Sequence, residues 1–265
     1  MSVCTFITCA VLIGSIFGNP ISVSNDDGIN YELYGGGFEG DMIFPEGYDP
    51  TTDHDGRGVA AFGPRQWPNN IVPYDLTLIT NAAHRTLIEQ AMATLTSVTS
   101  STVTGTAIRK NCVTFRPKAA GDGVFLKVQY GTGCSASVGY GTGERRMTLQ
   151  DPGCFRLGTI QHELIHVLGF HHEQSRPDRD LSITVNYGNI ELGKEHNFNK
   201  YTWGSTVFNQ NTPYDYVSIM HYGPNSFSKN GQPTIVPKDS NAKIGQRDKL
   251  SAVDIAEIRA FYKCL

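Results

Sequence analysis

The sequence predicts an α+β domain, with strands and helices in its first part and a largely irregular segment after them. Short runs typical of strands, separated by Gly- and Ser-rich turns, occur at 70–78, 112–116, 124–129 and 145–150. Apolar residues at helical spacing lie between and after these runs. From His172 to Ser251 the chain is rich in Asn, Gly, Pro and Tyr and has no regular pattern. We therefore expect a sheet with helices in one part and irregular structure in the other.

Two amphipathic helices are marked by apolar residues that recur at helical spacing. The first follows the strand at 70–78, and its apolar positions are Ala83, Leu87, Ile88, Ala91 and Leu95. The second begins near Leu157, and its apolar stripe consists of Leu157, Ile160, Leu164, Val167 and Leu168. Each stripe is expected to face the core.

The last helix has local start signals. Ser251 is a natural N-cap, and Asp254 stands three residues later, where its side chain can return a capping contact. Leu250 and Ile255 are placed as a hydrophobic staple. The buried face of this helix is expected to contain Ile255, Ile258 and Tyr262.

Composition excludes several classes of protein. With 265 residues the chain holds one large domain or two small ones. A formal net charge of −3 gives no sign of nucleic-acid binding. Charged residues make up 18% and aromatic residues 10%, which is typical of a folded extracellular domain and not of a disordered chain. We expect a monomer that binds neither nucleic acid nor membrane.

The N-terminal segment 1–18, MSVCTFITCAVLIGSIFG, predicts a signal peptide with cleavage near Gly18. It lacks the usual Lys or Arg before its apolar run. A membrane anchor is the alternative, but the run is short and has no stop-transfer flank. No later apolar run is long enough to span a bilayer. We therefore expect a secreted, extracellular protein.

Residues 19–57 form a segment apart, rich in Gly, Asp and Pro and with few periodic apolar positions. The segment ends at Arg57, a suitable cleavage point for a trypsin-like protease. This predicts a propeptide at 19–57 and a domain at 58–265.

Six cysteines are present, and Cys4 and Cys9 would leave with the signal peptide. The others are an even number in a chain bound for an oxidising compartment, which favours disulfides. Their spacing leaves all three pairings open. A cysteine ligand on a metal is disfavoured, because three histidines elsewhere in the chain, described next, already form a complete set of metal ligands. The four are Cys112, Cys134, Cys154 and Cys264.

The run HELIHVLGFHH at 162–172 matches H-E-x-x-H-x-x-G-x-x-H, the pattern of an extended zinc protease site. His162 and His166 lie four apart on a helix and project from one face towards one metal ion. Gly169 can end the helix in a left-handed conformation and bring round His172 as a third ligand. Three protein ligands leave a position for water, which Glu163 can face as a general base.

The alternative is a buried amphipathic helix that happens to contain histidines. The apolar stripe of this helix lies on the face opposite His162 and His166. Both histidines are therefore free to line a cleft, and the metal site is the favoured interpretation.

Two longer matches extend this motif: HELIHVLGFHHEQSRPDRD at 162–180 and SIMHY at 218–222. With them the chain resembles, from about Phe38 to its C-terminus, the astacin family of metzincin metalloendopeptidases. The resemblance implies a zincin-like fold, with a twisted sheet and helices in an N-terminal subdomain and an irregular C-terminal subdomain around a cleft. It also implies one zinc ion per chain, a hydrophobic floor at Met220 and a mobile zinc ligand at Tyr222. The family pattern gives His221 no metal role.

The family's propeptide motif F-x-G-D is matched by FEGD, which assigns Asp41 as the residue that occupies the water position on zinc before activation. A carboxylate suits this role because oxygen binds zinc readily. The glycines at 35–37 would let the segment pass through a narrow cleft. A solvated acidic loop is the alternative for a single aspartate.

The remaining assignments also come from the resemblance. Alignment at Trp67 places the mature N-terminus at Gly58, whose ammonium group would reach Glu173. No EGF-like or CUB module follows the peptidase domain, so a minimal form is expected. The family's disulfide pairs would be Cys112–Cys264 and Cys134–Cys154.

The function expected from residues and resemblance is that of a secreted zinc metalloendopeptidase made as a zymogen. It would hydrolyse internal peptide bonds of proteins or peptides, with Glu163 as general base and Tyr222 stabilising the oxyanion. A trypsin-like protease would activate it. The alternative is a secreted binding or toxin-like protein that has kept the fold and lost catalysis.

Overall fold

The computed structural model describes residues 29–45, 66–102, 105, 109–142, 144–204, 207 and 210–264. The expected signal peptide, Arg57 and Gly58 lie outside the described residues. Residues 29–45, which belong to the expected propeptide, are described, and we call them the prosegment.

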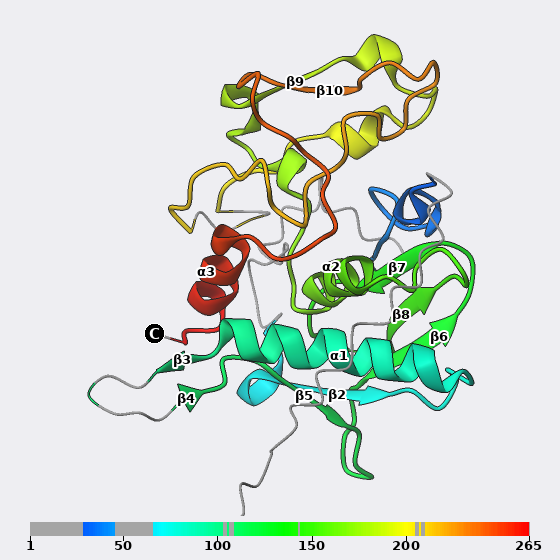
Figure 1. Ribbon diagram of the computed structural model, residues 1–265, viewed down its shortest axis with the longest axis vertical. Helices are drawn as coiled ribbons and strands as arrows, with labels where there is room; N and C mark the ends of the chain where they lie inside the picture. Colours follow the sequence, from blue (N-terminus) through cyan, green and yellow to red (C-terminus); the bar gives the residue numbers. More distant parts are fainter. Residues whose placement is uncertain are drawn as a thin grey trace, which may run out of the picture.

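A six-stranded mixed sheet forms the first part of the domain (Figure 1). Its only antiparallel pair is β7 with β8, and the other neighbouring strands run parallel. The edge strand β1 belongs to the prosegment, which thus extends the sheet of the peptidase domain. In spatial order the strands are β1 (Met42–Ile43), β7 (Cys134–Ser137), β8 (Arg145–Leu149), β6 (Leu126–Tyr130), β2 (Ile71–Asp75) and β5 (Thr114–Pro117).

The four predicted strands are present with shifted ends, whereas β1 and β7 were not predicted. The strand expected at 70–78 ends at Asp75, because a turn follows in which Ile79 N–H bonds Leu76 C=O. Strand β7 is the small, polar run CSAS, fully buried between β1 and β8. It contains no β-branched or aromatic residue, the residue types that usually mark a strand.

Helices α1 (Ala82–Thr99) and α2 (Leu157–Val167) pack on each other, and α2 also contacts β7 and β8. Helix α1 begins at Asn81, whose side chain accepts from Ala83 N–H. Of the predicted apolar face of α1, Ile88, Ala91 and Leu95 are buried, Leu87 is partly buried and Ala83 is exposed. His84 is buried instead, stacked on Phe155 with ring centroids 3.6 Å apart.

Helix α2 begins at the predicted residue, but it has no open face. Every residue from Gly158 to Val167 is buried. Its apolar stripe lies in the main core, and its histidine face is covered by the prosegment residue Asp41. The helix pattern alone predicted a histidine face free to line a cleft. In this structure the prosegment, which lies outside the peptidase domain, occupies that face.

The second part of the domain is irregular, as predicted, apart from short elements (Figure 1). Strands β9 (Ile183–Val185) and β10 (Ile235–Pro237) form an antiparallel pair over a small separate core. The remaining short elements are η1 (Tyr31–Tyr34), η2 (Pro68–Asn70), β3 (Ser101–Thr102), β4 (Arg109–Lys110), η3 (Glu173–Ser175), η4 (Arg179–Leu181), η5 (Tyr187–Asn189) and η6 (Glu195–Phe198).

Helix α3 (Ala252–Phe261) has the predicted capping box. The Ser251 side chain accepts from Asp254 N–H, and the Asp254 carboxylate accepts from Ser251 N–H. Asp254 also bonds Ser218 Oγ and Ile219 N–H, at 2.6 and 3.0 Å. The start of α3 is thereby tied to the turn that contains Met220.

The disulfides join Cys112 to Cys264 and Cys134 to Cys154, the pairs that the family resemblance implies. Their sequence separations are 152 and 20 residues. In the loop-entropy model they contribute about 5 and about 3 kcal/mol to stability. The long bridge connects the end of α3 to the chain just before β5.

None of the helices in the described ranges is both long and apolar enough to cross a membrane. The apolar run at 1–18 lies outside those ranges.

Candidate active site

Three histidines converge beside α2. His162 and His166 lie one turn apart on the helix, and Gly169 (φ 104°) ends it in a conformation that side chains rarely adopt. The chain then turns so that His172 returns to the same point. The ring centroids of the three histidines are 4.7, 4.8 and 5.4 Å apart.

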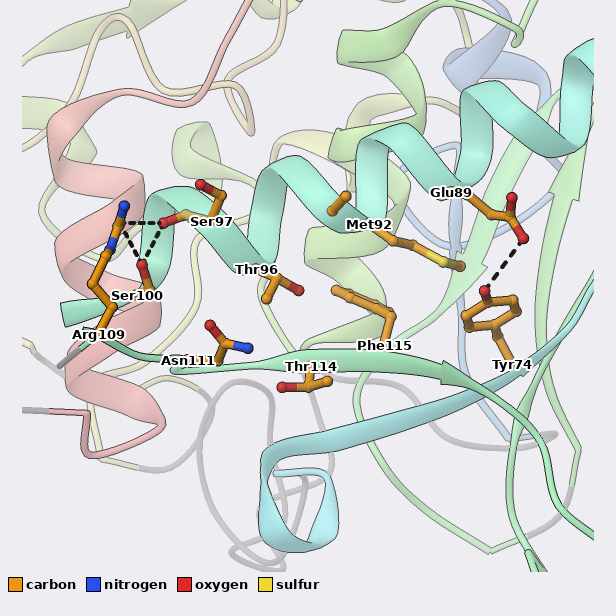
Figure 2. A pocket seen from close by; sticks show the side chains of 11 residues that line it. Tyr74, Glu89, Met92, Thr96, Ser97, Ser100, Arg109, Asn111, Thr114 and Phe115 are labelled. Carbon is orange, nitrogen blue, oxygen red and sulfur yellow. Dashed lines mark hydrogen bonds between the residues drawn. The ribbon is translucent and has the colours of Figure 1, made fainter. Parts of the chain in front are cut away.

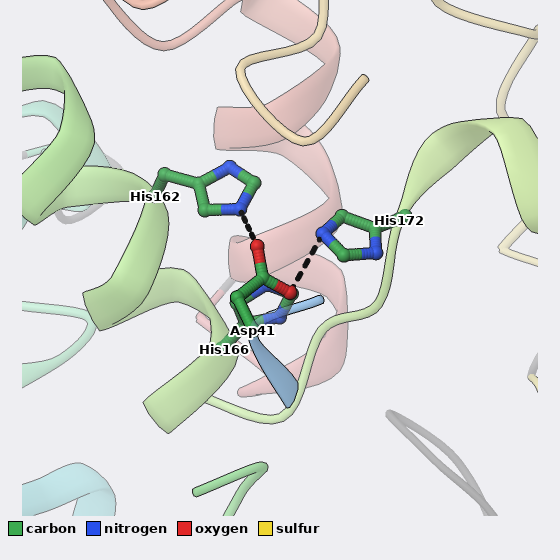
Figure 3. Close-up of side chains that lie close together, drawn as sticks. All are labelled: Asp41, His162, His166 and His172. Carbon is green, nitrogen blue, oxygen red and sulfur yellow. Dashed lines mark hydrogen bonds and ion pairs between the residues drawn. The ribbon is translucent and has the colours of Figure 1, made fainter. Parts of the chain in front are cut away.

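The carboxylate of Asp41 lies among these three rings (Figure 3). Its Oδ2 is 3.2 Å from His162 Nε2, and its Oδ1 is 3.2 Å from His172 Nε2 and 3.5 Å from His166 Nε2. One ligand atom from each of the four side chains lies within 4.8 Å of all the others. The motif spacing predicted that the three histidines meet, and the family resemblance assigned Asp41 to them; the structure brings all four side chains together.

Each histidine is oriented through its other ring nitrogen. His162 Nδ1 lies 2.9 Å from Ile219 C=O, and His166 Nδ1 lies 2.7 Å from Phe170 C=O. His172 Nδ1 lies 2.8 Å from a carboxylate oxygen of Glu39. With a proton on each Nδ1, all three Nε2 atoms present lone pairs to one point, the arrangement that holds histidine ligands on metals.

The donor set fits a zinc ion. Three imidazole nitrogens and one carboxylate oxygen are the ligand types and the ligand number that zinc prefers. Within the described part of the chain, Asp41 Oδ1, His166 Nε2 and His172 Nε2 are buried and make no hydrogen bond. Buried polar atoms normally have a partner. A shared cation would satisfy all three.

Electrostatics also favours positive charge at this point. Burial opposes the charged form of His172, but the Asp41 and Glu39 carboxylates raise its pKa to about 9. Burial likewise opposes ionisation of Asp41, yet His172 and His166 hold its pKa well below the usual range. The surroundings of Asp41 therefore favour its ionised form, which positive charge among the three histidines stabilises.

Glu163 lies on α2 beside the histidines and is fully buried. Neither of its carboxylate oxygens has a hydrogen-bond partner among the described residues. Burial, together with the nearby Asp41 and Glu32 carboxylates, raises its pKa well above the usual range. A carboxyl group in this setting is suited to exchanging a proton.

The Met-turn residues lie next to this cluster. Met220 is buried, and its carbonyl accepts from Glu173 N–H at 3.1 Å. The Tyr222 ring lies 4.8 Å from the His172 ring, and its hydroxyl donates to the Glu39 carbonyl. His221 is instead bonded to the Tyr214 hydroxyl and the Tyr222 carbonyl, so its ring nitrogens are engaged outside the cluster.

Glu173 is buried next to His172 but outside the cluster. Its carboxylate accepts from Asp215 N–H at 2.7 Å and lies 3.5 Å from the Arg176 guanidinium. Burial raises its pKa well above the usual range despite Arg176. The expected contact with the ammonium group of Gly58 involves a residue outside the described ranges.

Two acidic prosegment residues that contact the site were not predicted from the sequence. Glu39 bonds His172, and the buried Glu32 forms a bidentate ion pair with the partly buried Arg247, with contacts of 2.7 and 2.9 Å. Glu39 could have been suspected from its place inside FEGD. No local signal marks Glu32 and Arg247 as partners, because 215 positions separate them.

We expect Glu32→Gln to weaken docking of the prosegment by about 3 kcal/mol, because it leaves the largely buried Arg247 charge without its carboxylate partner. Ala136 N–H bonds Asp41 C=O of the prosegment at 2.8 Å, so its hydrogen exchange reports on docking. Exchange should accelerate roughly 10²-fold in native buffer.

The matched double variant Glu32→Gln/Arg247→Met removes both charges and should recover part of the protection of Ala136 N–H against hydrogen exchange. Unchanged exchange at Ala136 in Glu32→Gln would show that the pair does not anchor the prosegment.

A separate cavity of about 490 Å³ lies between α1 and β5 (Figure 2). Its polar groups bond one another: Arg109 donates to the Ser97 carbonyl and to the Ser100 hydroxyl, and the Tyr74 hydroxyl donates to Glu89. Among the described residues that line it there is no histidine or cysteine, so they form no set of metal ligands like the one beside α2.

The mixed sheet, the cluster of three histidines beside α2 and the methionine turn define the class as metzincin-type metallopeptidases. The family model for the astacin peptidases matches residues 61–263. The chain belongs to the astacin family.

Two relatives and one solved structure support the assignment to this family. Blastula protease 10 of Paracentrotus lividus is 37% identical over 245 residues, covering 86% of this chain and 38% of that protein. Zinc metalloproteinase nas-14 of Caenorhabditis elegans is 38% identical over 213 residues, covering 80% and 40%. This chain thus spans about two fifths of the length of these relatives.

The solved structure is that of High choriolytic enzyme 1, a hatching enzyme zinc-protease from Oryzias latipes. It matches with a TM-score of 0.65 and 36% identity, covering 76% of this chain and 94% of that one.

Proposed function

We propose that this protein is a zinc metalloendopeptidase and that the structure represents its latent form. His162, His166 and His172 are the metal ligands, and Asp41 is the fourth ligand until the prosegment leaves. The observation that carries this proposal is the Asp41 carboxylate lying 3.2–3.5 Å from all three Nε2 atoms. A carboxylate there takes the position that a nucleophilic water needs.

Zinc held by this set would lower the pKa of a bound water towards about 7 and polarise the scissile carbonyl. Glu163 accepts the proton of the attacking water and transfers it to the leaving amine. Its raised pKa supports this double role, because the group must be able to hold a proton at neutral pH.

Tyr222 is engaged in the latent form, where its hydroxyl donates to Glu39 C=O. Departure of the prosegment frees this hydroxyl to donate to the oxygen of the scissile carbonyl, where negative charge develops. Burial raises the pKa of Tyr222 well above its usual value, so the hydroxyl stays protonated and remains a donor.

Activation in this proposal is cleavage after Arg57 by a trypsin-like protease, and the new ammonium group at Gly58 pairs with Glu173. The buried Glu173 carboxylate has Arg176 as a partner but lies near the further acids Glu257 and Asp215. This acidic surrounding supports binding of an additional cation. The N-terminal apolar segment and the two disulfides support secretion.

The non-catalytic alternative is not favoured. A binding protein that had lost catalysis would not need a general base with unsatisfied oxygens beside three converging histidines. Such groups cost stability when they serve no purpose. The substrates that fit the proposal are internal peptide bonds of proteins or peptides.

The test uses purified full-length protein treated with trypsin and assayed on quenched fluorogenic peptides. We expect cleavage within the peptide, its loss with 1,10-phenanthroline, and its recovery with zinc but not with magnesium. Cleavage that persists after removal of the metal would refute the proposed function.

A further inference from the structure

We propose that the peptidase domain contains a carboxylate-binding site separate from the metal position, formed by His172 Nδ1, Ser175 Oγ and the Tyr201 hydroxyl. The prosegment residue Glu39 occupies it, orients His172 and so couples retention of the prosegment to retention of the metal. This inference rests on the proposed function, because it takes His172 as a metal ligand.

The contacts of Glu39 define the site. One carboxylate oxygen, Oε2, lies 2.8 Å from His172 Nδ1. The other, Oε1, accepts from Ser175 Oγ at 2.7 Å and from the Tyr201 hydroxyl at 2.8 Å. Glu39 has no exposed surface, and the three donor residues are at most 4% exposed. A fully buried carboxylate with three donors occupies a buried anion-binding site and does not merely contact the surface.

The three donors are suited to binding a carboxylate group. Burial and the Glu39 charge raise the pKa of Tyr201 well above its usual value, so this hydroxyl keeps its proton and donates. With the Nδ1 proton directed to Glu39, His172 presents its Nε2 lone pair to the metal position. The prosegment carboxylate thereby fixes the tautomer of one ligand.

His172 differs from the other two ligands in the source of the acceptor that orients its ring. His162 and His166 are oriented by the carbonyls of Ile219 and Phe170, which belong to the peptidase domain. These acceptors stay when the prosegment leaves. Only His172, which comes from a loop and not from α2, takes its orienting acceptor from the segment that is removed.

The backbone at Glu39 shows that this placement is specific. Glu39 has a φ of 49°, in the left-handed region that non-glycine residues rarely adopt. Its carbonyl accepts from the Tyr222 hydroxyl while its carboxylate binds the three donors. A strained backbone of this kind persists only when surrounding contacts hold it. Glu39 and Asp41 thus bind two separate points of the active site.

Metal binding and docking of the prosegment are coupled by thermodynamic reciprocity. If Glu39 strengthens metal binding by orienting His172, bound metal strengthens docking of the prosegment by the same factor. Loss of an orienting partner of a histidine ligand typically lowers metal affinity about 10–100-fold. Cleavage of the prosegment would then yield an active enzyme that holds its zinc less tightly than the latent chain.

The test is the zinc affinity of the full-length, uncut chain, measured by competition with a chromogenic chelator. We expect Glu39→Gln to bind zinc at one ion per chain with about 10-fold lower affinity, because the charge on the orienting acceptor is lost. Tyr201→Phe should lower the affinity less, about 3–5-fold, because it removes one of three hydrogen bonds to Glu39. The matched control Glu89→Gln removes a carboxylate on α1 and should change nothing.

A double-variant comparison separates this role from general loosening of the fold. In the background of Glu39→Ala, adding Tyr201→Phe should have no further effect on zinc affinity, because Tyr201 acts through the carboxylate. Equal zinc affinity of the wild-type chain and Glu39→Gln would overturn the inference. So would additive effects of the two substitutions. Absence of zinc binding by the wild-type chain would instead refute the proposed function.

Discussion

Replacing Glu163 with Gln is expected to lower kcat/KM of the trypsin-treated protein by about 10³-fold or more, because the general base is lost. Zinc should remain bound at one ion per chain, since Glu163 is not in the cluster of three histidines and Asp41. The amide keeps the size of the side chain but cannot take the proton of the attacking water. Peptide hydrolysis and metal analysis on the same sample measure both quantities.

The matched control is Glu144→Gln, which removes a partly exposed carboxylate on the surface and should retain full activity. If Glu163→Gln keeps substantial turnover with zinc bound, Glu163 is not the general base. If the variant instead loses its zinc, the loss of activity says nothing about proton transfer, and Glu163 would have to be placed among the groups that retain the metal.

Replacing Asp41 with Ala is expected to give the uncut full-length chain measurable peptidase activity, whereas the uncut wild-type chain should be inactive. The carboxylate among the three histidines is removed, and the position becomes open to water. We expect an increase of at least about 10-fold over wild type, limited by the prosegment that still fills the cleft. The assay is fluorogenic peptide hydrolysis without trypsin.

The double variant Asp41→Ala/Glu163→Gln provides the control, because activity that comes from this active site must disappear in it. Equal latency of the Asp41→Ala and wild-type chains would remove Asp41 from the mechanism of inhibition. The Glu32–Arg247 pair and the Glu39 contacts would then be sufficient to block the cleft without a ligand to the metal.

Local sequence patterns predicted the parts of the protein that depend on short-range geometry. His162 and His166 share a face because four residues make about one turn of helix, whatever the rest of the chain does. The capping box of Ser251 and Asp254 likewise needs only the first turn of α3. Four strands were predicted from short runs separated by Gly- and Ser-rich turns. The small, polar strand β7 was not, because its neighbours and not its residues make it a strand.

Other features depend on contacts between residues far apart in the sequence. The Asp41 carboxylate lies 121 positions from His162, and Glu39 lies 133 positions from His172. Spacing rules cannot identify such pairs, since the positions of distant segments depend on how the whole chain packs. The resemblance to astacins assigned Asp41, but it assigned no role to Glu39, Glu32 or Arg247.

The sequence by itself therefore determined the metal-binding motif, the candidate general base and the last helix, because each depends on residues within a turn or two of one another. It indicated the class of peptidase through two separate motifs, at 162–180 and 218–222. The tertiary structure decided which groups orient the three histidines and how the prosegment is held. Those contacts form only when the sheet, the two helices and the prosegment pack together. A buried carboxylate is stable only where that packing supplies its donors.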